Sequence, residues 1–167
     1  SVIVVSQNGL YKAKTQKLKK LQKHFSYQLN ESRKNKVTYH NAELIFDGHL
    51  WMFYGDKDKK EITVNIDIQQ TFNKEDLFQF EVSSLNDGSY YDLYVHYKNG
   101  EKSKIHHSSE PGLFEMKAVD LKDSKVDSIE VILHSTRGLG FSIKRCTWLT
   151  FSNESINLQK SKHNKIR

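Results

Sequence analysis

The residues best suited to contact a ligand are aromatic and polar side chains that share one face of an extended segment. Residues 90–97 alternate in character, so Tyr94 and His96 fall opposite the apolar residues of a strand. The same alternation in residues 50–54 sets Trp51 opposite its immediate neighbours. An outward ring beside polar groups can stack on a sugar, because it offers a flat apolar surface. We predict Trp51, Tyr94 and His96 as carbohydrate contacts. The alternative, strongest for Trp51, is packing in the core.

A second group of candidate binding residues is basic and lies at the start of the chain. Residues 1–36 hold nine Lys or Arg and one acid, a balance of +8, and they include Lys17, Lys20 and Lys23. Four more bases follow from Lys160 onward. Since the whole chain carries +6, the residues in between carry −6. We predict that the three lysines contact an anionic ligand, and that the acidic body has a different role.

The basic segment allows three interpretations. It could lie on an anionic membrane surface, with apolar side chains inserted and lysines near the headgroups. It could contact a phosphate polymer, either nucleic acid or teichoic acid, through the release of counterions. It could instead pack its apolar stripe on the body or on a partner and leave its lysines in solvent.

Residue types that perform catalysis or bind metals form no recognisable motif. The eight histidines lack the short spacings of a zinc site, and the adjacent His106 and His107 point to opposite faces of a strand. We therefore expect no metal and no cofactor. The single Cys146 follows Lys144 and Arg145, whose charge can lower a thiol pKa, but a small core residue is the simpler interpretation. We expect no enzyme activity within this chain, which could be a fragment of a larger enzyme.

The segment that carries the lysines is predicted to be helical. Residues 10–32 contain no glycine or proline and are rich in Lys, Leu and Gln, which favour helix. Apolar side chains recur at helical spacing along one narrow face: Tyr11, Leu18, Leu21, Phe25 and Leu29. A basic amphipathic helix is therefore expected there, preceded by a short strand at Val2–Val5.

The body shows a period of two instead. Residues 61–68 alternate strictly between polar and apolar, which is typical of a half-buried strand in an antiparallel sheet. Weaker versions of the pattern predict strands at 44–46, 50–54, 78–82, 90–98, 102–107, 113–119, 129–134 and 139–149. Asp-Gly at 47–48 and Asn-Gly at 99–100 predict hairpin turns. Short strands at this spacing predict a sandwich or a barrel.

Length and composition suit one domain with appendages. The chain has 167 residues, of which 37% are hydrophobic and 11% aromatic, enough for one core. We predict an arm at 1–36, a β-sandwich domain at 37–151 and a basic tail at 152–167. No stretch reaches the roughly 18 apolar residues of a membrane span. The single cysteine excludes an intrachain disulfide, which suits the cytosol or a bacterial surface.

The segment 85–95 resembles the tyrosine corner of immunoglobulin-like sandwiches. It reads Leu-Asn-Asp-Gly-Ser-Tyr-Tyr-Asp-Leu-Tyr-Val. The resemblance implies that the hydroxyl of Tyr90 or Tyr91 bonds back to the main chain and that Leu93 points inward. The usual cysteine pair is missing, so a disulfide-free immunoglobulin-like β-sandwich is expected. The alternative is an ordinary Asp-Gly turn before a strand.

A wider resemblance rests on the stretch Gly-x-Tyr-Tyr-Asp-Leu-Tyr-Val followed by Lys-Asn-Gly-Glu-Lys, within residues 85–105. With the basic helix, it is similar to accessory modules of Gram-positive teichoic-acid and capsule glycosyltransferases. That resemblance implies a noncatalytic module that forms homo-oligomers or holds an anionic glycopolymer or other carbohydrate. It also implies a cytoplasmic location at the bacterial membrane, or the cell surface. The alternative function is nucleic-acid binding through the helix and tail, against which the acidic body argues.

Overall fold

The computed structural model describes residues 19–55, 61–135 and 140–155, and the side chains within 25–55, 61–135 and 140–151. The chain divides into two compact units. One is Phe25–Thr150, which holds the features discussed below. The other combines Ser1–His24 with Phe151–Arg167, and its described part consists of the first half of one strand and the end of another.

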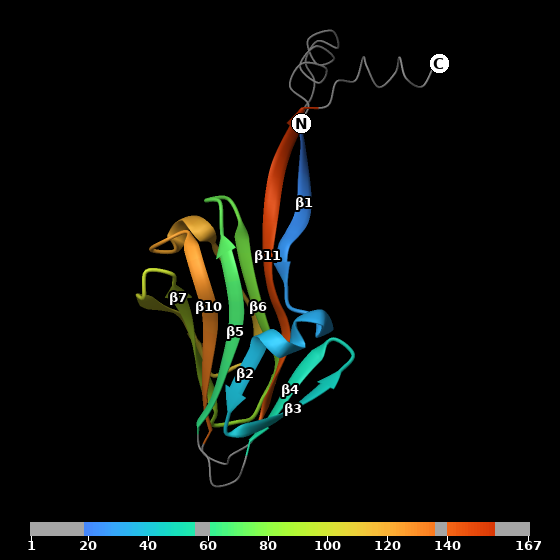
Figure 1. Cartoon of the computed structure of the whole chain (residues 1–167). Helices are drawn as coiled ribbons and strands as arrows, with labels where there is room; N and C mark the ends of the chain where they lie inside the picture. The colour runs from blue at the N-terminus through green and yellow to red at the C-terminus, as the bar shows by residue number, and fades with distance from the viewer. Residues whose placement is uncertain (1–18, 56–60, 136–139, 156–167) are drawn as a thin grey trace, which may run out of the picture. The chain divides into compact units, whose positions relative to one another are not determined.

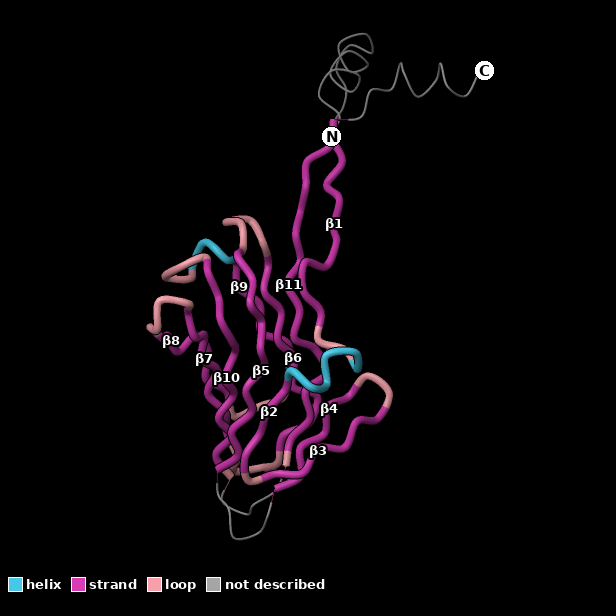
Figure 2. The backbone as a smooth tube through the Cα atoms, in the orientation of Figure 1, coloured by secondary structure: helices cyan, strands magenta, loops and turns pink. Residues whose placement is uncertain are grey.

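Strands make up most of the described chain, and they form two sheets that face each other (Figure 1). One sheet has the order β3 (Ala42–Asp47), β4 (Leu50–Gly55), β11 (Phe141–Ser155), β6 (Leu77–Leu85) and β9 (Gly112–Lys117), with β1 (Lys19–Gln28) also paired to β11. The other has the order β2 (Val37–His40), β5 (Glu61–Thr71), β10 (Lys125–His134), β7 (Tyr90–Tyr97) and β8 (Lys102–Ser108). Figure 2 shows the two short 3-10 helices, Glu31–Lys36 and Ala118–Asp120, between strands.

The predicted antiparallel β-sandwich is confirmed. Every ladder with a defined register is antiparallel, and the alternation in β5 buries Ile62, Val64, Ile66 and Ile68 as expected. The described strands form sheets of six and five, against the seven or nine strands of immunoglobulin domains.

Tyr90 and Tyr91, the two residues predicted for the tyrosine corner, both lie in the described structure. Tyr91 is buried, and burial raises its pKa to about 12, while a hydrogen bond with the Ser108 side chain acts in the opposite direction. Tyr90 lies on the outer surface of the same strand and stacks on His134. In the described structure these two rings therefore contact side chains of β8 and β10.

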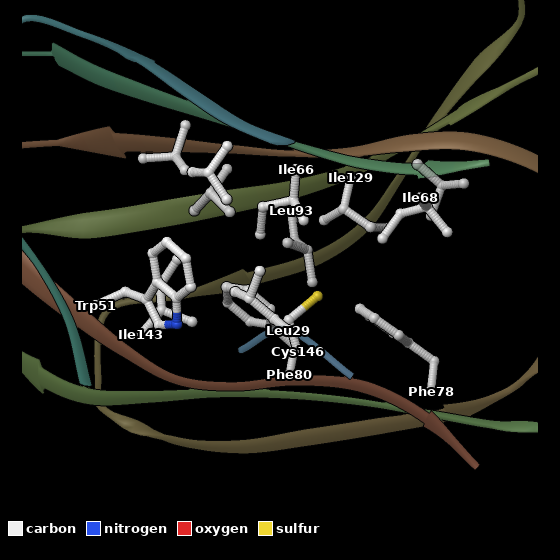
Figure 3. Packing of buried hydrophobic residues seen from close by; sticks show 14 of the residues in the cluster. Leu29, Trp51, Ile66, Ile68, Phe78, Phe80, Leu93, Ile129, Ile143 and Cys146 are labelled. Atoms are coloured by element: carbon white, nitrogen blue, oxygen red, sulfur yellow. The ribbon is translucent and has the colours of Figure 1, made fainter. Parts of the chain in front are cut away.

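The core between the sheets is rich in aromatic rings (Figure 3). Trp148 stacks on Phe72 with ring centroids 3.7 Å apart and meets Phe78 at 4.5 Å. Cys146 is fully buried among these side chains, and burial raises the pKa of its thiol. Its neighbours in sequence therefore do not activate it, and it packs as a small core residue. Removal of such apolar area from water is the main stabilising contribution to a sandwich of this kind.

Both predicted hairpin turns are present. Gly48 has φ +62° and joins β3 to β4, and Gly100 has φ +91° and joins β7 to β8. Glycine adopts these left-handed angles without the steric cost that a Cβ atom adds. The turns therefore fix the registers of the two hairpins, Asp47 opposite Leu50 and His96 opposite Lys102.

The predicted N-terminal helix is wrong for the part of it that the structure describes. Residues 19–28 form strand β1, the segment Glu31–Lys36 forms a 3-10 helix, and residues 1–18, including the expected strand at Val2–Val5, lie outside the described residues. The sequence has a second period: Phe25, Tyr27 and Leu29 recur every two residues. Pairing with β11 selects that period, because the strand gains a partner for its main-chain groups.

One glycine fixes the point where β11 enters the sheet. A Cβ atom on Gly140 would lie 1.7 Å from the carbonyl oxygen of Phe53. The main chains of β4 and β11 therefore approach each other here as only a glycine allows. Among the described residues, no helix has the length and apolar character needed to cross a membrane.

Candidate functional site

The outward side of the five-stranded sheet carries a dense group of polar and aromatic side chains. We call it the outer face, and it comprises Glu61 (β5), Tyr90, Asp92, Tyr94 and His96 (β7), Lys102, Lys104 and His107 (β8), and Glu130 and His134 (β10). Residues between them on β7, such as Leu93 and Val95, are fully buried. Because side chains alternate along a strand, burial of one set places the other set on the solvent side.

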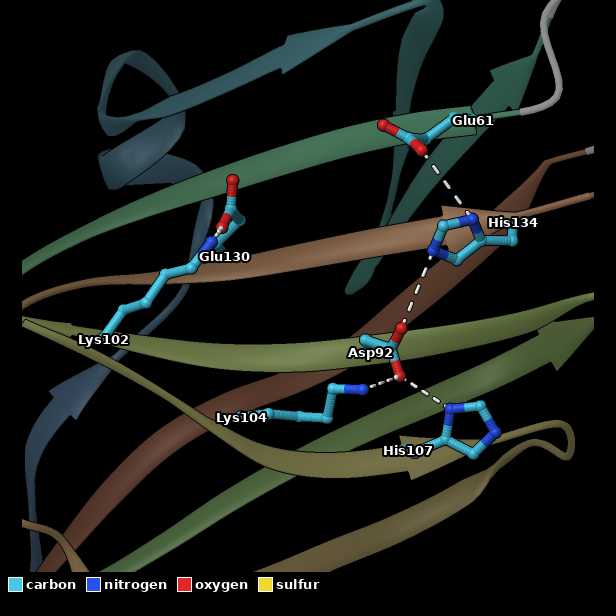
Figure 4. A network of polar contacts seen from close by, with 7 residues as sticks. All are labelled: Glu61, Asp92, Lys102, Lys104, His107, Glu130 and His134. Atoms are coloured by element: carbon cyan, nitrogen blue, oxygen red, sulfur yellow. Dashed lines mark hydrogen bonds and ion pairs between the residues drawn. The ribbon is translucent and has the colours of Figure 1, made fainter.

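Asp92 is the centre of one cluster on this face (Figure 4). Its Oδ1 lies 2.6 Å from Nδ1 of His107 and 3.6 Å from Nζ of Lys104. Its Oδ2 lies 3.6 Å from Nε2 of His134, and Nδ1 of His134 lies 3.7 Å from Oε2 of Glu61. Four strands thus contribute to one connected group.

The protonation of Asp92 reflects two opposing influences. Burial by itself raises the pKa of the carboxyl, because the charged form loses water. The hydrogen bond with His107 and the charges of Lys104, His107 and His134 outweigh burial, so the pKa of Asp92 is lowered. The carboxylate is therefore held as an anionic acceptor, with its position fixed by neighbouring strands.

A second cluster lies further along the same strands. His96 places Nε2 2.9 Å from Oε1 of Glu130, and Nζ of Lys102 lies 3.9 Å from the same oxygen. The Tyr94 ring lies between two lysines, with Nζ of Lys102 4.7 Å and Nζ of Lys104 5.9 Å from its centroid. These cation–π contacts connect the two clusters.

Tyr90 gives the face an exposed aromatic surface. Its ring stacks on His134 at 4.6 Å with an interplanar angle of 20°, and its centroid lies 5.1 Å from that of His107. The residue is 38% exposed, so part of the ring is open to solvent. A flat ring that is fixed by its neighbours, beside acceptors and donors on rigid strands, can bind a ligand that has both apolar faces and hydroxyl groups.

The structure brings together two of the residues predicted from sequence. Tyr94 and His96 both lie on the outer face. The outward orientation predicted for Trp51 is wrong: it is 1% exposed and lies between the sheets opposite Ile143 (Figure 3). The physical reason is that β4 lies within its sheet and turns its other set of side chains, which includes the exposed Tyr54, to solvent.

The predicted basic contacts fall largely outside the described structure. Lys17 lies outside the described residues, and Lys20 and Lys23 belong to strand β1 rather than to a helix, with side chains outside the described part. Their predicted role in binding an anionic ligand stays a prediction.

Sequence reasoning did not select Asp92, His107 or His134. The alternation in residues 90–97 could have predicted Asp92, because it belongs to the same set as Tyr94 and His96. His107 and His134 required the strand registers, which place them opposite Asp92 and Tyr90. Among the described residues, no group of His, Cys, Asp and Glu is arranged to hold a metal ion.

Comparisons with known proteins bear on the fold. No protein-family model matches the chain, and no curated protein matches it significantly. Among solved structures, an exo-β-agarase has a TM-score of 0.53 with 13% identity over 76% of this chain and 25% of that one. PfGH50B has a TM-score of 0.52 with 11% identity over 72% of this chain and 23% of that one.

A smaller protein matches over nearly its full length. A mutant of the family 29 carbohydrate-binding module CBM29-2, complexed with cellulohexaose, has a TM-score of 0.51 and 17% identity over 78% of this chain and 91% of that one. This chain thus spans about a quarter of the agarase and PfGH50B chains and most of the module. At these identities the similarity establishes the fold: a β-sandwich of the kind found in carbohydrate-binding modules.

Proposed function

We propose that this domain binds a carbohydrate, and that the ligand lies across the outer face. The observation that carries the proposal is the convergence on one rigid surface of an exposed Tyr90 ring with the fixed polar groups of Asp92 and His96. A sugar ring has an apolar face that stacks on an aromatic ring, and hydroxyls that both donate and accept hydrogen bonds. The outer face offers partners for each of these groups.

The charge on the outer face favours a neutral saccharide. Each acid there has a basic partner: Asp92 lies beside His107, Glu130 beside His96 and Glu61 beside His134, at distances between 2.6 and 3.7 Å. The face carries three carboxylates and two lysines, and Nζ of Lys104 lies 3.6 Å from Asp92 while Nζ of Lys102 lies 3.9 Å from Glu130. These charges largely compensate each other, so the face offers directed hydrogen-bonding groups with little net charge. A neutral sugar chain is therefore the ligand class that the surface fits best.

The shared fold supports the proposal independently of these contacts. The CBM29-2 structure holds cellulohexaose, and an exo-β-agarase contains a domain of the same fold. That similarity does not assign a ligand to this chain. The two structures do suggest the first probes to test, which are cello-oligosaccharides and agar-derived oligosaccharides.

The test compares two exposed tyrosines on opposite sheets. The full chain is titrated with cellohexaose, neoagarohexaose and galactotriose in an isothermal calorimeter, beside Tyr90→Ala and, as the matched control, Tyr54→Ala. Tyr54 is 45% exposed on β4, in the other sheet. We expect at least one sugar to bind, Tyr90→Ala to weaken it about tenfold, or ~1.4 kcal/mol, and Tyr54→Ala to leave it unchanged. No binding to any of the three, or equal losses in both variants, would refute the proposal.

The finer predictions extend this proposal. Three finer predictions are a role beside a cell-envelope glycosyltransferase, assembly into homo-oligomers and a location at the membrane. They rest on the resemblance in residues 85–105 and on the basic segment at residues 1–36. Light scattering of the full chain tests assembly, for which a dimer or trimer is expected. Salt-sensitive binding to duplex DNA would support the nucleic-acid alternative instead.

A further inference from the structure

A groove of about 500 Å³ lies in the six-stranded sheet, where the strand pairing changes. β4 pairs with β11 only as far as Trp51 opposite Ile143. Beyond that point the main-chain N–H of Leu29 donates to the carbonyl of Cys146, so the chain leaving β1 takes over as the partner of β11. The β3–β4 hairpin continues without β11 beside it. The groove lies between that hairpin, β11 and the end of β1, and is separate from the outer face.

Aromatic side chains form part of the groove lining. Phe25 is 53% exposed, the largest exposed fraction among the large hydrophobic residues that the structure describes. Phe46 packs edge-on against Trp51 at 5.1 Å, and both line the groove. The Phe25 ring therefore presents an open apolar surface that is wide enough for a sugar ring.

Two adjacent cations on β11 line the same groove. Lys144 is exposed and makes no ion pair with any residue whose side chain the structure describes. Arg145 lies beside Glu81, with Nε 3.5 Å from Oε1, and its side chain is 40% exposed, so part of the guanidinium faces solvent. His49 adds a third basic side chain from the hairpin, and Glu31 is the acid in the lining. Lys144 thus differs from the two lysines of the outer face, which lie beside Glu130 and Asp92.

We infer that this groove is a second saccharide site and that it binds an acidic sugar residue, whose carboxylate or sulfate lies against Lys144 and Arg145 while its ring stacks on Phe25. Guanidinium and ammonium groups are the usual partners of such anions, and arginine can bind them in a bidentate manner. The inference rests on the proposed function only in that both ligands are saccharides, because the two sites share no residue.

The experiment uses short ligands, so that the basic leader contributes little. The full chain is titrated with trigalacturonate, which carries carboxylates, with a sulfated chondroitin disaccharide, and with neutral galactotriose. We expect trigalacturonate or the sulfated sugar to bind, which distinguishes the two sources of the anion. Phe25→Ala and Lys144→Gln should each weaken that binding about tenfold. Tyr90→Ala should leave it unchanged, which separates this site from the outer face.

Two control variants make the same kinds of change at exposed positions away from the groove. Lys98→Gln removes the same charge from the exposed turn between β7 and β8, and Leu113→Ala truncates an exposed apolar residue of β9 that is 47% accessible. Neither should change the affinity. The inference is overturned if neither acidic sugar binds, if Lys98→Gln weakens binding as much as Lys144→Gln, or if a short DNA duplex competes as well as the acidic sugar.

Discussion

The outer face and the groove contain similar residue types, but their charges are arranged differently. On the outer face each acid has a basic partner, and Lys104 lies beside both Asp92 and the Tyr94 ring. In the groove Lys144 has no ion partner among the described side chains, and Arg145 lies beside Glu81. The difference follows from backbone pairing. Regular registers bring side chains of neighbouring strands opposite each other, whereas the change of partner along β11 leaves its side chains facing an open space.

This difference has a consequence for stability as well as for binding. A side chain in a paired network makes hydrogen bonds and ion pairs with its neighbours. Its removal therefore leaves partly buried groups without partners. A cation such as Lys144, which faces an open groove, makes no ion pair with a described side chain in the free protein. We therefore expect the outer face to contribute to the free energy of unfolding, and the groove to contribute chiefly to ligand binding.

The largest expected effect concerns the start of β11, where its main chain meets that of β4. Gly140→Ala should lower the free energy of unfolding by about 3 kcal/mol, because the added Cβ would clash with the main chain of Phe53. Chemical denaturation monitored by tryptophan fluorescence measures the change. Gly100→Ala is the control: its Cβ meets no atom within 4 Å, and only its φ of +91° is unfavourable, so a loss of about 1 kcal/mol is expected. Equal losses in the two variants would contradict the close approach of β4 and β11.

An intermediate effect tests the comparison directly. Asp92→Ala should lower the free energy of unfolding by about 2 kcal/mol, because His107, Lys104 and His134 lose their shared acceptor. Lys144→Ala should change it by no more than about 0.5 kcal/mol, as for exposed residues generally. Both values come from the same denaturation experiment. If the two variants lost similar stability, the outer face and the groove would not differ as described.

The smallest effect is a dependence of stability on pH. The pKa of His106 is lowered, first by burial and then by the charge of His107, and its ring stacks on Phe114 at 4.1 Å. The folded state therefore favours neutral His106, and in the range just below its usual pKa of 6.5 the unfolded chain binds more protons. Stability should fall as the pH drops through this range. The lowered pKa of Asp92 acts in the same direction at more acidic pH, below 3.8.

The variant His106→Phe keeps a ring against Phe114 and removes the titrating group. Denaturation midpoints measured from pH 7 downward should show a shallower decline in this variant than in the unmodified chain. His40→Phe, at an exposed histidine of β2, is the matched control and should retain the full decline. A decline of equal steepness in all three proteins would rule out His106 as its source.

Much of the fold could be predicted from the sequence, because alternation and turn residues act locally. The period of two in residues 61–68 and the glycines at 48 and 100 define strands and hairpins without reference to the rest of the chain. The N-terminal segment was mispredicted because it carries two periods at once. Leu18, Leu21, Phe25 and Leu29 fit a helix, whereas Phe25, Tyr27 and Leu29 fit a strand, and local preference does not decide between them.

The candidate sites could be predicted only in part. The alternation in β7 was sufficient to place Tyr94 and His96 on one surface. It could not show that His107 and His134, 15 and 42 positions from Asp92 in sequence, would lie beside its carboxylate. It also could not show that Trp51 faces inward, because each strand has two faces, and contact with the second sheet determines which one is buried.

The sequence by itself determined the extended body, its turns, the lone buried cysteine and the separation of a basic leader from an acidic body. These depend on side-chain character and short-range geometry. The tertiary structure alone decided which strands pair, which face of each is buried, that residues 19–28 extend along β11, and that a groove forms where β4 leaves β11. Those features depend on hydrogen bonds and contacts between segments far apart in the chain, and no local pattern encodes them.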